Sequence, residues 1–121
     1  MVTNRVPETV EQRRVVRMLR ASKIVFCSVP NGGYRSKSTA AAMVAEGMVA
    51  GAPDLLIFDP PPGALGSVGV ALEMKALDGR LAENQKAFLD KLQARGWIPL
   101  VCYGAEDAIT RLRALGYLLR C

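Results

Sequence analysis

The length, composition and charge of this chain exclude several classes of protein. At 121 residues, half of them hydrophobic, it is large enough for one folded domain and has no apolar run that could cross a bilayer. It has no histidine, which excludes a Ser-His-Asp triad and a histidine-ligated zinc ion, and its three cysteines lack a CxxC spacing. The net charge of +5 favours a polyanionic partner. We expect one domain, residues 1–121, with a cytoplasmic location and no membrane contact.

Residues 7–20 predict an amphipathic helix. At about 100° per residue, one face carries Glu8, Gln12, Val15, Val16 and Leu19. The opposite face carries Arg13, Arg14, Arg17 and Arg20. A carboxylate in the first turn is favoured by the helix dipole, which explains Glu8 without any further role. For the arginines, we favour a solvated basic face over contact with nucleic acid.

The next segment predicts a strand, a loop and a second helix. Residues 23–30 form the strand, in which Cys27 is expected to be buried, as is Cys102 in a later strand. A loop with Asn31, Gly32, Gly33, Arg35 and Lys37 precedes an alanine-rich helix over residues 38–48, with Ser36 or Ser38 as N-cap. Backbone amides and two cations beside a helix N-terminus suit a phosphate group. An ordinary turn with solvent-facing charges is the alternative.

The stretch over residues 52–76 concentrates the ionic groups that most need an explanation. Pro53 and Asp54 precede an apolar run, residues 55–58, which predicts a central strand. Residues 59–67, rich in proline and glycine, form a hairpin-type connection to a second strand, residues 70–75.

Alternation in the second strand separates its ionic groups from its core positions. Glu73 and Lys75 point to one face. The core face carries Val68, Val70, Leu72 and Met74. If the two strands are neighbours, Asp54 and Glu73 can share one Mg²⁺ or Mn²⁺ ion, and a water held near Lys75 would attack a phosphodiester. A strand cap and an exposed ion pair would explain the same residues without catalysis.

The last third of the chain predicts a helix, a strand and a final helix. The first helix covers residues 81–95, and its apolar stripe contains Gln85, an amide that needs a polar partner, for which we expect Glu73 and Lys75. The strand covers residues 97–103, and a helix follows Gly104. The apolar tail, residues 117–119, is a candidate dimer contact. The whole order predicts an α/β fold of three layers around a small central mixed sheet.

Several short motifs together resemble one nuclease family. Pro53-Asp54, followed nineteen residues on by Glu73-Met-Lys75, is similar to the PD-(D/E)XK signature. The flanking motifs are similar to the VRR-NUC branch of that superfamily and run in the same order: Val29-Pro-Asn-Gly-Gly33 with Arg35, Ala45-Glu-Gly47, Ala50-Gly-Ala-Pro-Asp54, Gly79-Arg-Leu81, Gln85-Lys-Ala-Phe88 and Val101-Cys102. The resemblance covers about residues 8–118.

The resemblance implies a restriction-endonuclease-like fold and a role for each site residue. Asp54, Glu73, the Met74 carbonyl and Glu8 would bind Mg²⁺ or Mn²⁺, with Gln12 at the family's spacing from Glu8. Lys75 would position or deprotonate the water, and Gln85 would orient that water or Lys75. The loop with Asn31, Gly32, Gly33 and Arg35, together with Lys37, would face DNA.

The family further implies a DNA endonuclease of phage or prophage type. It would act as a homodimer on branched DNA, such as a four-way (Holliday) junction or a flap. Two alternatives stay open: a basic DNA-binding or scaffold module without cleavage activity, and a restriction-type endonuclease that cuts at a defined sequence.

Overall fold

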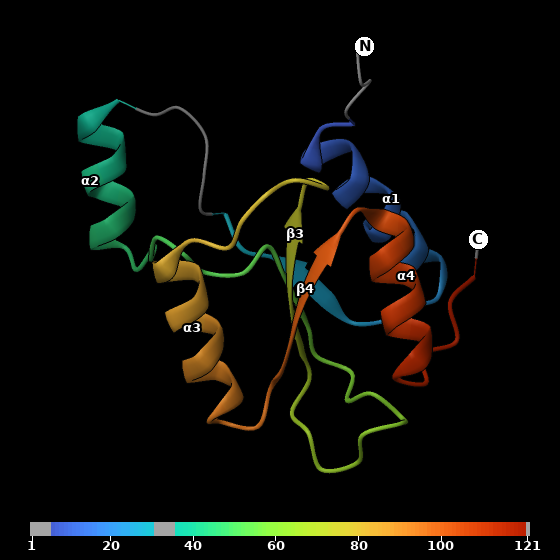
Figure 1. Cartoon of the computed structure of the whole chain (residues 1–121). Coiled ribbons are helices and arrows are strands. Elements are labelled where there is room, and N and C mark those ends of the chain that lie inside the picture. Colours follow the sequence, from blue (N-terminus) through green and yellow to red (C-terminus); the bar gives the residue numbers. More distant parts are fainter. Residues whose placement is uncertain (1–5, 31–35, 121) are drawn as a thin grey trace.

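The computed structural model describes residues 6–30 and 36–120 and has helices and strands in the predicted order (Figure 1). The helices are α1 (Glu8–Ala21), α2 (Lys37–Ala45), α3 (Glu83–Gln93) and α4 (Ala105–Ala114). The strands are β1 (Phe26–Ser28), β2 (Leu55–Ile57), β3 (Val70–Lys75) and β4 (Ile98–Tyr103). No helix in these two ranges is long and apolar enough to span a membrane.

The four strands form one mixed sheet in the order β1-β2-β3-β4. β2 pairs antiparallel with β1 and with β3, whereas β4 pairs parallel with β3. The parallel pair needs a crossover connection, which α3 provides. The two strands that carry the predicted site are therefore central neighbours, as the sequence predicted.

The sheet lies between two helical layers, which confirms the predicted three-layer arrangement. Figure 1 shows α1 and α4 together on one side of the sheet and α3 on the other. The core lies on the α1 and α4 side, where Val15 and Leu19 of α1 meet Ile109 and Leu112 of α4. The site residues Glu73 and Lys75 belong to the opposite face of β3, because side chains alternate along a strand.

The core face of β3 agrees with the predicted alternation except at its beginning. Val70, Leu72 and Met74 are buried, with exposures of 0%, 0% and 1%. The prediction for Val68 was wrong: its side chain is 46% exposed. Val68 precedes the strand, and its N–H donates to the carbonyl of Gly96 in the connection to β4.

The two cysteines in strands have opposite environments. Cys102 is fully buried, and this burial raises its pKa to about 12. The prediction that Cys27 is buried was wrong, because Cys27 is exposed. It lies in β1, a three-residue strand at the edge of the sheet, and its side chain points away from the face that packs on the core.

Helix α2 stands apart from the core. Its nine residues are mostly alanine, methionine and valine, yet none of them is buried. Ser36 is its N-cap, and the Ser36 hydroxyl accepts from the N–H of Thr39, as predicted for one of the two candidate serines. An apolar helix with no buried residue leaves its apolar side chains open to a partner.

Gly69 lies where the backbone just before β3 approaches the backbone of β2 closely. A Cβ atom built there would lie 2.2 Å from the Ile57 carbonyl oxygen and 3.0 Å from the Trp97 ring. We expect Gly69→Ala to lower the free energy of unfolding by about 1–3 kcal/mol, because the backbone must shift to admit a methyl group. Gly79→Ala is the control, since its nearest atom would be 3.1 Å away. Urea denaturation measures both variants, and an equal effect of the two would contradict the close approach at Gly69.

Candidate active site

The register of the central hairpin places Asp54 opposite Glu73. The last paired residues of β2 and β3 are Leu55 and Leu72, so the next step of the same antiparallel register joins Asp54 to Glu73. Directly opposed residues in such a pair project to the same face, with Cβ atoms about 5 Å apart. Two carboxylates that are nineteen residues apart in the sequence thus meet at the end of the sheet.

Asp54 is held in place by the backbone of the neighbouring strand. Its Oδ2 accepts a hydrogen bond of 2.7 Å from the N–H of Met74. In a strand, the N–H and C=O of one residue point to the same side, so the Met74 carbonyl also faces this gap beyond the end of β2. The site therefore combines one fixed carboxylate, a second carboxylate and a backbone carbonyl.

Glu73 is the buried charged residue of the core, with 3% of its surface exposed. Its Oε1 atom has no hydrogen-bond partner among the described residues. Burial is the main cause that raises its pKa, to about 9, and the hydrogen bond with Asp54 and the charge of Asp54 raise it further. Glu73 therefore keeps its proton to a higher pH than an ordinary glutamic acid does.

Lys75 and Glu8 complete the ionic surroundings of Glu73. The charge of Lys75 lowers the pKa of Glu73, and the charge of Glu8 raises it, so both groups lie near the acid pair. Glu8 is exposed at the start of α1, and its Oε1 accepts a 3.1 Å hydrogen bond from the N–H of Ala76, directly after β3. The first turn of α1 is thereby fixed to the end of the strand that carries Glu73 and Lys75.

The described residues contain no group of three acidic or cysteine side chains that could hold a metal ion. The pair Asp54 and Glu73 is thus the acidic part of the candidate site, with Glu8 attached to the backbone beside it. Such a pair is sufficient for Mg²⁺, which usually binds one or two carboxylates and retains several waters. The buried, unpartnered oxygen of Glu73 is the atom that a hard cation would satisfy.

Gln85 has a different partner from the predicted one. Its Oε1 accepts a 2.9 Å hydrogen bond from the N–H of Ala82, the N-cap residue of α3. The prediction assigned this amide to Glu73 and Lys75. Because Ala82 has no side chain that can cap the helix, the glutamine three residues on supplies the cap by bonding back to the backbone.

The predicted DNA-facing segment lies mostly outside the described residues. Asn31, Gly32, Gly33 and Arg35 belong to the range 31–35, which the structure leaves out. Lys37 is described: it is exposed and is the first residue of α2.

Sequence reasoning missed the structural role of Glu11. Its Oε2 accepts from the N–H of Ala105 at 3.2 Å, which caps the start of α4, and it pairs with Arg14 at 3.5 Å. Arg14 also pairs with Glu106 at 2.6 Å. An acid and an arginine at helical spacing within α1 were the available signal, but their partners on α4 are remote in the sequence.

Comparisons with known proteins agree with this fold. The model of the VRR-NUC domain matches residues 6–106 of this chain. A solved structure named "VRR_NUC domain protein" is similar with a TM-score of 0.71 and 23% sequence identity, and the match covers 92% of this chain and 88% of that one. No curated protein matches significantly.

The four-stranded mixed sheet with helices on both faces and an acid pair beside Lys75 defines a domain of the restriction-endonuclease-like class. The chain belongs to the VRR-NUC family, because the family model covers most of its length. Membership of this family indicates a nuclease, that is, a hydrolase that acts on nucleic acid.

Proposed function

We propose that this chain is a metal-dependent DNA endonuclease whose site consists of Asp54, Glu73, Lys75 and the Met74 carbonyl. The observation that carries the proposal is the buried carboxylate oxygen of Glu73 that has no partner among the described residues. A buried polar atom of this kind is costly unless a proton or a cation satisfies it. It lies next to Asp54, which supports a shared ligand of opposite charge.

The donor set fits Mg²⁺ or Mn²⁺. Asp54, Glu73 and the Met74 carbonyl are hard oxygen donors, and Glu8, which is bonded to the Ala76 N–H, would contribute through a water. When bound, the cation would supply Lewis-acid stabilisation of charge on the phosphate. Lys75 would hold the attacking water and offset the charge that develops on the phosphoryl oxygens.

Gln85 keeps a supporting part in the proposed site. Its side-chain oxygen caps α3, while its amide nitrogen remains a donor that can orient a water near Lys75. The connection between the two residues is short, since α3 begins eight residues after the end of β3. Capping and water orientation use different atoms of one amide, so the two roles are compatible.

The proposed enzyme acts as a homodimer on branched DNA. Helix α2 supports a second copy as the partner, because its apolar residues have no buried position and Val44 is 59% exposed. In the tail, Tyr117 packs into its own core, whereas Leu118 is 90% exposed and available for contact. Two sites held at a fixed separation would select a four-way junction or a flap by shape.

A panel of labelled substrates tests this function. We expect the protein with Mn²⁺ to cleave a four-way junction or a flap faster than linear duplex or single-stranded DNA, and to cleave none of them in EDTA. If the protein bound these DNAs in Mn²⁺ but formed no product, the result would indicate the alternative function, a DNA-binding module that does not cleave. Discrete fragments from long linear duplex would instead indicate sequence-specific cutting.

A further inference from the structure

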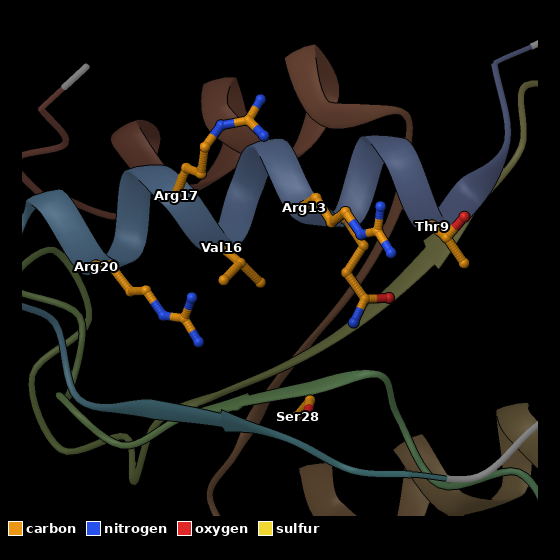
Figure 2. A pocket seen from close by; sticks show the side chains of 7 residues that line it. Thr9, Arg13, Val16, Arg17, Arg20 and Ser28 are labelled. Carbon is orange, nitrogen blue, oxygen red and sulfur yellow. The ribbon is translucent and has the colours of Figure 1, made fainter.

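A groove runs along the outer side of α1, next to the edge strand β1. It has a volume of about 540 Å³ and is lined by Thr9, Gln12, Arg13, Val16, Arg17, Arg20 and Ser28 (Figure 2). Figure 2 shows Val16 and Arg20 directed toward the side of α1 on which Ser28 lies, with Arg13 one turn further along the helix and Arg17 pointing away from Ser28. Two guanidinium groups thus flank an apolar patch.

Three of the arginines that line the groove have no charge partner among the described residues. Within residues 6–30 and 36–120, the ion pairs of α1 belong to Arg14, which contacts Glu11 and Glu106. Arg13, Arg17 and Arg20 pair with no described carboxylate and are exposed. The groove is therefore a site of uncompensated positive charge, and an anionic ligand complements it.

The groove begins beside the proposed active site. Thr9 follows Glu8, which bonds to the backbone at the end of β3. At the facing wall, Ser28 precedes Val29, whose N–H donates to the Asp54 carbonyl at 2.9 Å. Both walls of the groove thus extend to the backbone beside Asp54 and Glu73. A DNA strand that leaves the active site past the end of the sheet can therefore continue into the groove.

We propose that this groove binds the sugar-phosphate backbone of a single DNA strand that extends from the active site. This proposal rests on the proposed nuclease function and adds the path of the strand to it. Arg13 and Arg20 are seven residues apart, about 10.5 Å along the helix axis, so their guanidinium groups can contact different phosphates of one strand. Arginines bind the phosphates, and Val16 lies against sugars or bases, the combination that grooves for single strands use.

The lining of the groove favours a single strand over a duplex. A volume of about 540 Å³ is that of a pocket for a drug-sized ligand, so part of an unpaired strand can lie inside it, in contact with both the arginines and Val16. A guanidinium group can also stack on an unpaired base, which a base inside a duplex does not offer. The single-stranded arm of a flap or of a frayed junction is the matching part of a branched substrate.

The test compares Arg13→Ala/Arg20→Ala with a control that removes the same charge elsewhere. The control is Arg95→Ala/Arg113→Ala, since Arg95 and Arg113 are exposed on other elements. Fluorescence anisotropy measures binding to a duplex with a single-stranded arm and to the blunt duplex, at several KCl concentrations, with Ca²⁺ in place of Mn²⁺ to prevent cleavage. Circular dichroism verifies that each variant is folded.

We expect the double variant to bind the arm-bearing duplex about 25-fold more weakly at 0.1 M salt, with the slope of log K against log salt smaller by about 1.4, as for two lost single-strand phosphate contacts. The affinity of the double variant for the blunt duplex should change little, and so should the affinity of the control variant for either DNA. The proposal is overturned if the double variant matches the control, if wild-type protein does not bind the arm, or if the blunt duplex loses as much affinity. A lack of cleavage in Mn²⁺ would overturn the nuclease function alone, because this comparison measures binding only.

Discussion

Lys75→Ala should lower the cleavage rate by about 10²–10³ and leave the fold and DNA binding in place. Lys75 is the last residue of β3 and is half-buried, so truncation removes no core contact. The ammonium group acts where negative charge develops, and removal of one such group typically lowers the rate by about 10²–10³. Single-turnover cleavage of a four-way junction or flap with saturating Mn²⁺ measures the loss.

The control for this variant is Lys86→Ala. Lys86 is exposed on α3, where it pairs with Asp90 at 3.3 Å. It should cleave like the wild-type protein. Asp54→Asn provides a second disabled variant, because an asparagine oxygen can still accept from the Met74 N–H while the charge is lost. Normal cleavage by Lys75→Ala would contradict the role that we assign to this residue.

Glu73→Gln should stabilise the metal-free protein at alkaline pH and at the same time weaken metal binding. Glu73 has a pKa of about 9 in the folded chain, well above its usual value of 4.5. Between these two values the folded state binds more protons than the unfolded state, so the free energy of unfolding decreases as the pH rises. Glutamine imitates the protonated acid and removes this dependence.

The expected gain from Glu73→Gln is about 1–3 kcal/mol at pH 8, with little effect near pH 4.5. Urea denaturation in EDTA at a series of pH values measures it, and isothermal titration with Mn²⁺ measures the lost affinity. In the wild-type protein, the bound cation should displace the proton of Glu73, so the heat should depend on the ionisation enthalpy of the buffer. Glu46→Gln, exposed at the end of α2, is the control. If the free energy of unfolding changed with pH in the same way for the wild type and for Glu73→Gln, the raised pKa of Glu73 would be contradicted.

The order of the elements and the central pairing could be predicted from the sequence because their signals are local. Alternation in β3 separates Glu73 and Lys75 from the buried Leu72 and Met74, and the apolar run before it identifies β2 as a central strand. A proline- and glycine-rich connection then leaves an antiparallel hairpin as the simplest arrangement. That hairpin is what places Asp54 opposite Glu73.

The errors occurred where tertiary context decides between two locally equal arrangements. An apolar strand pattern does not show that β1 is short and lies at the sheet edge, so Cys27 was assigned to the core. Gln85 lies three residues after Ala82, the spacing of a capping box, but Ala82 replaces the usual Ser or Thr of that motif. The motif was therefore not recognised in the sequence. The basic groove depends on which arginines of α1 lack partners on α4, and no local pattern records this.

The most direct test of the shared cation is a crystal of the protein grown with Mn²⁺, with diffraction data collected for the anomalous signal of manganese. We predict one strong peak between the carboxylates of Asp54 and Glu73, within coordination distance of the Met74 carbonyl, and no such peak for Glu73→Gln. A fully ordered site without a peak at saturating Mn²⁺, or a peak bound by other residues, would contradict the account.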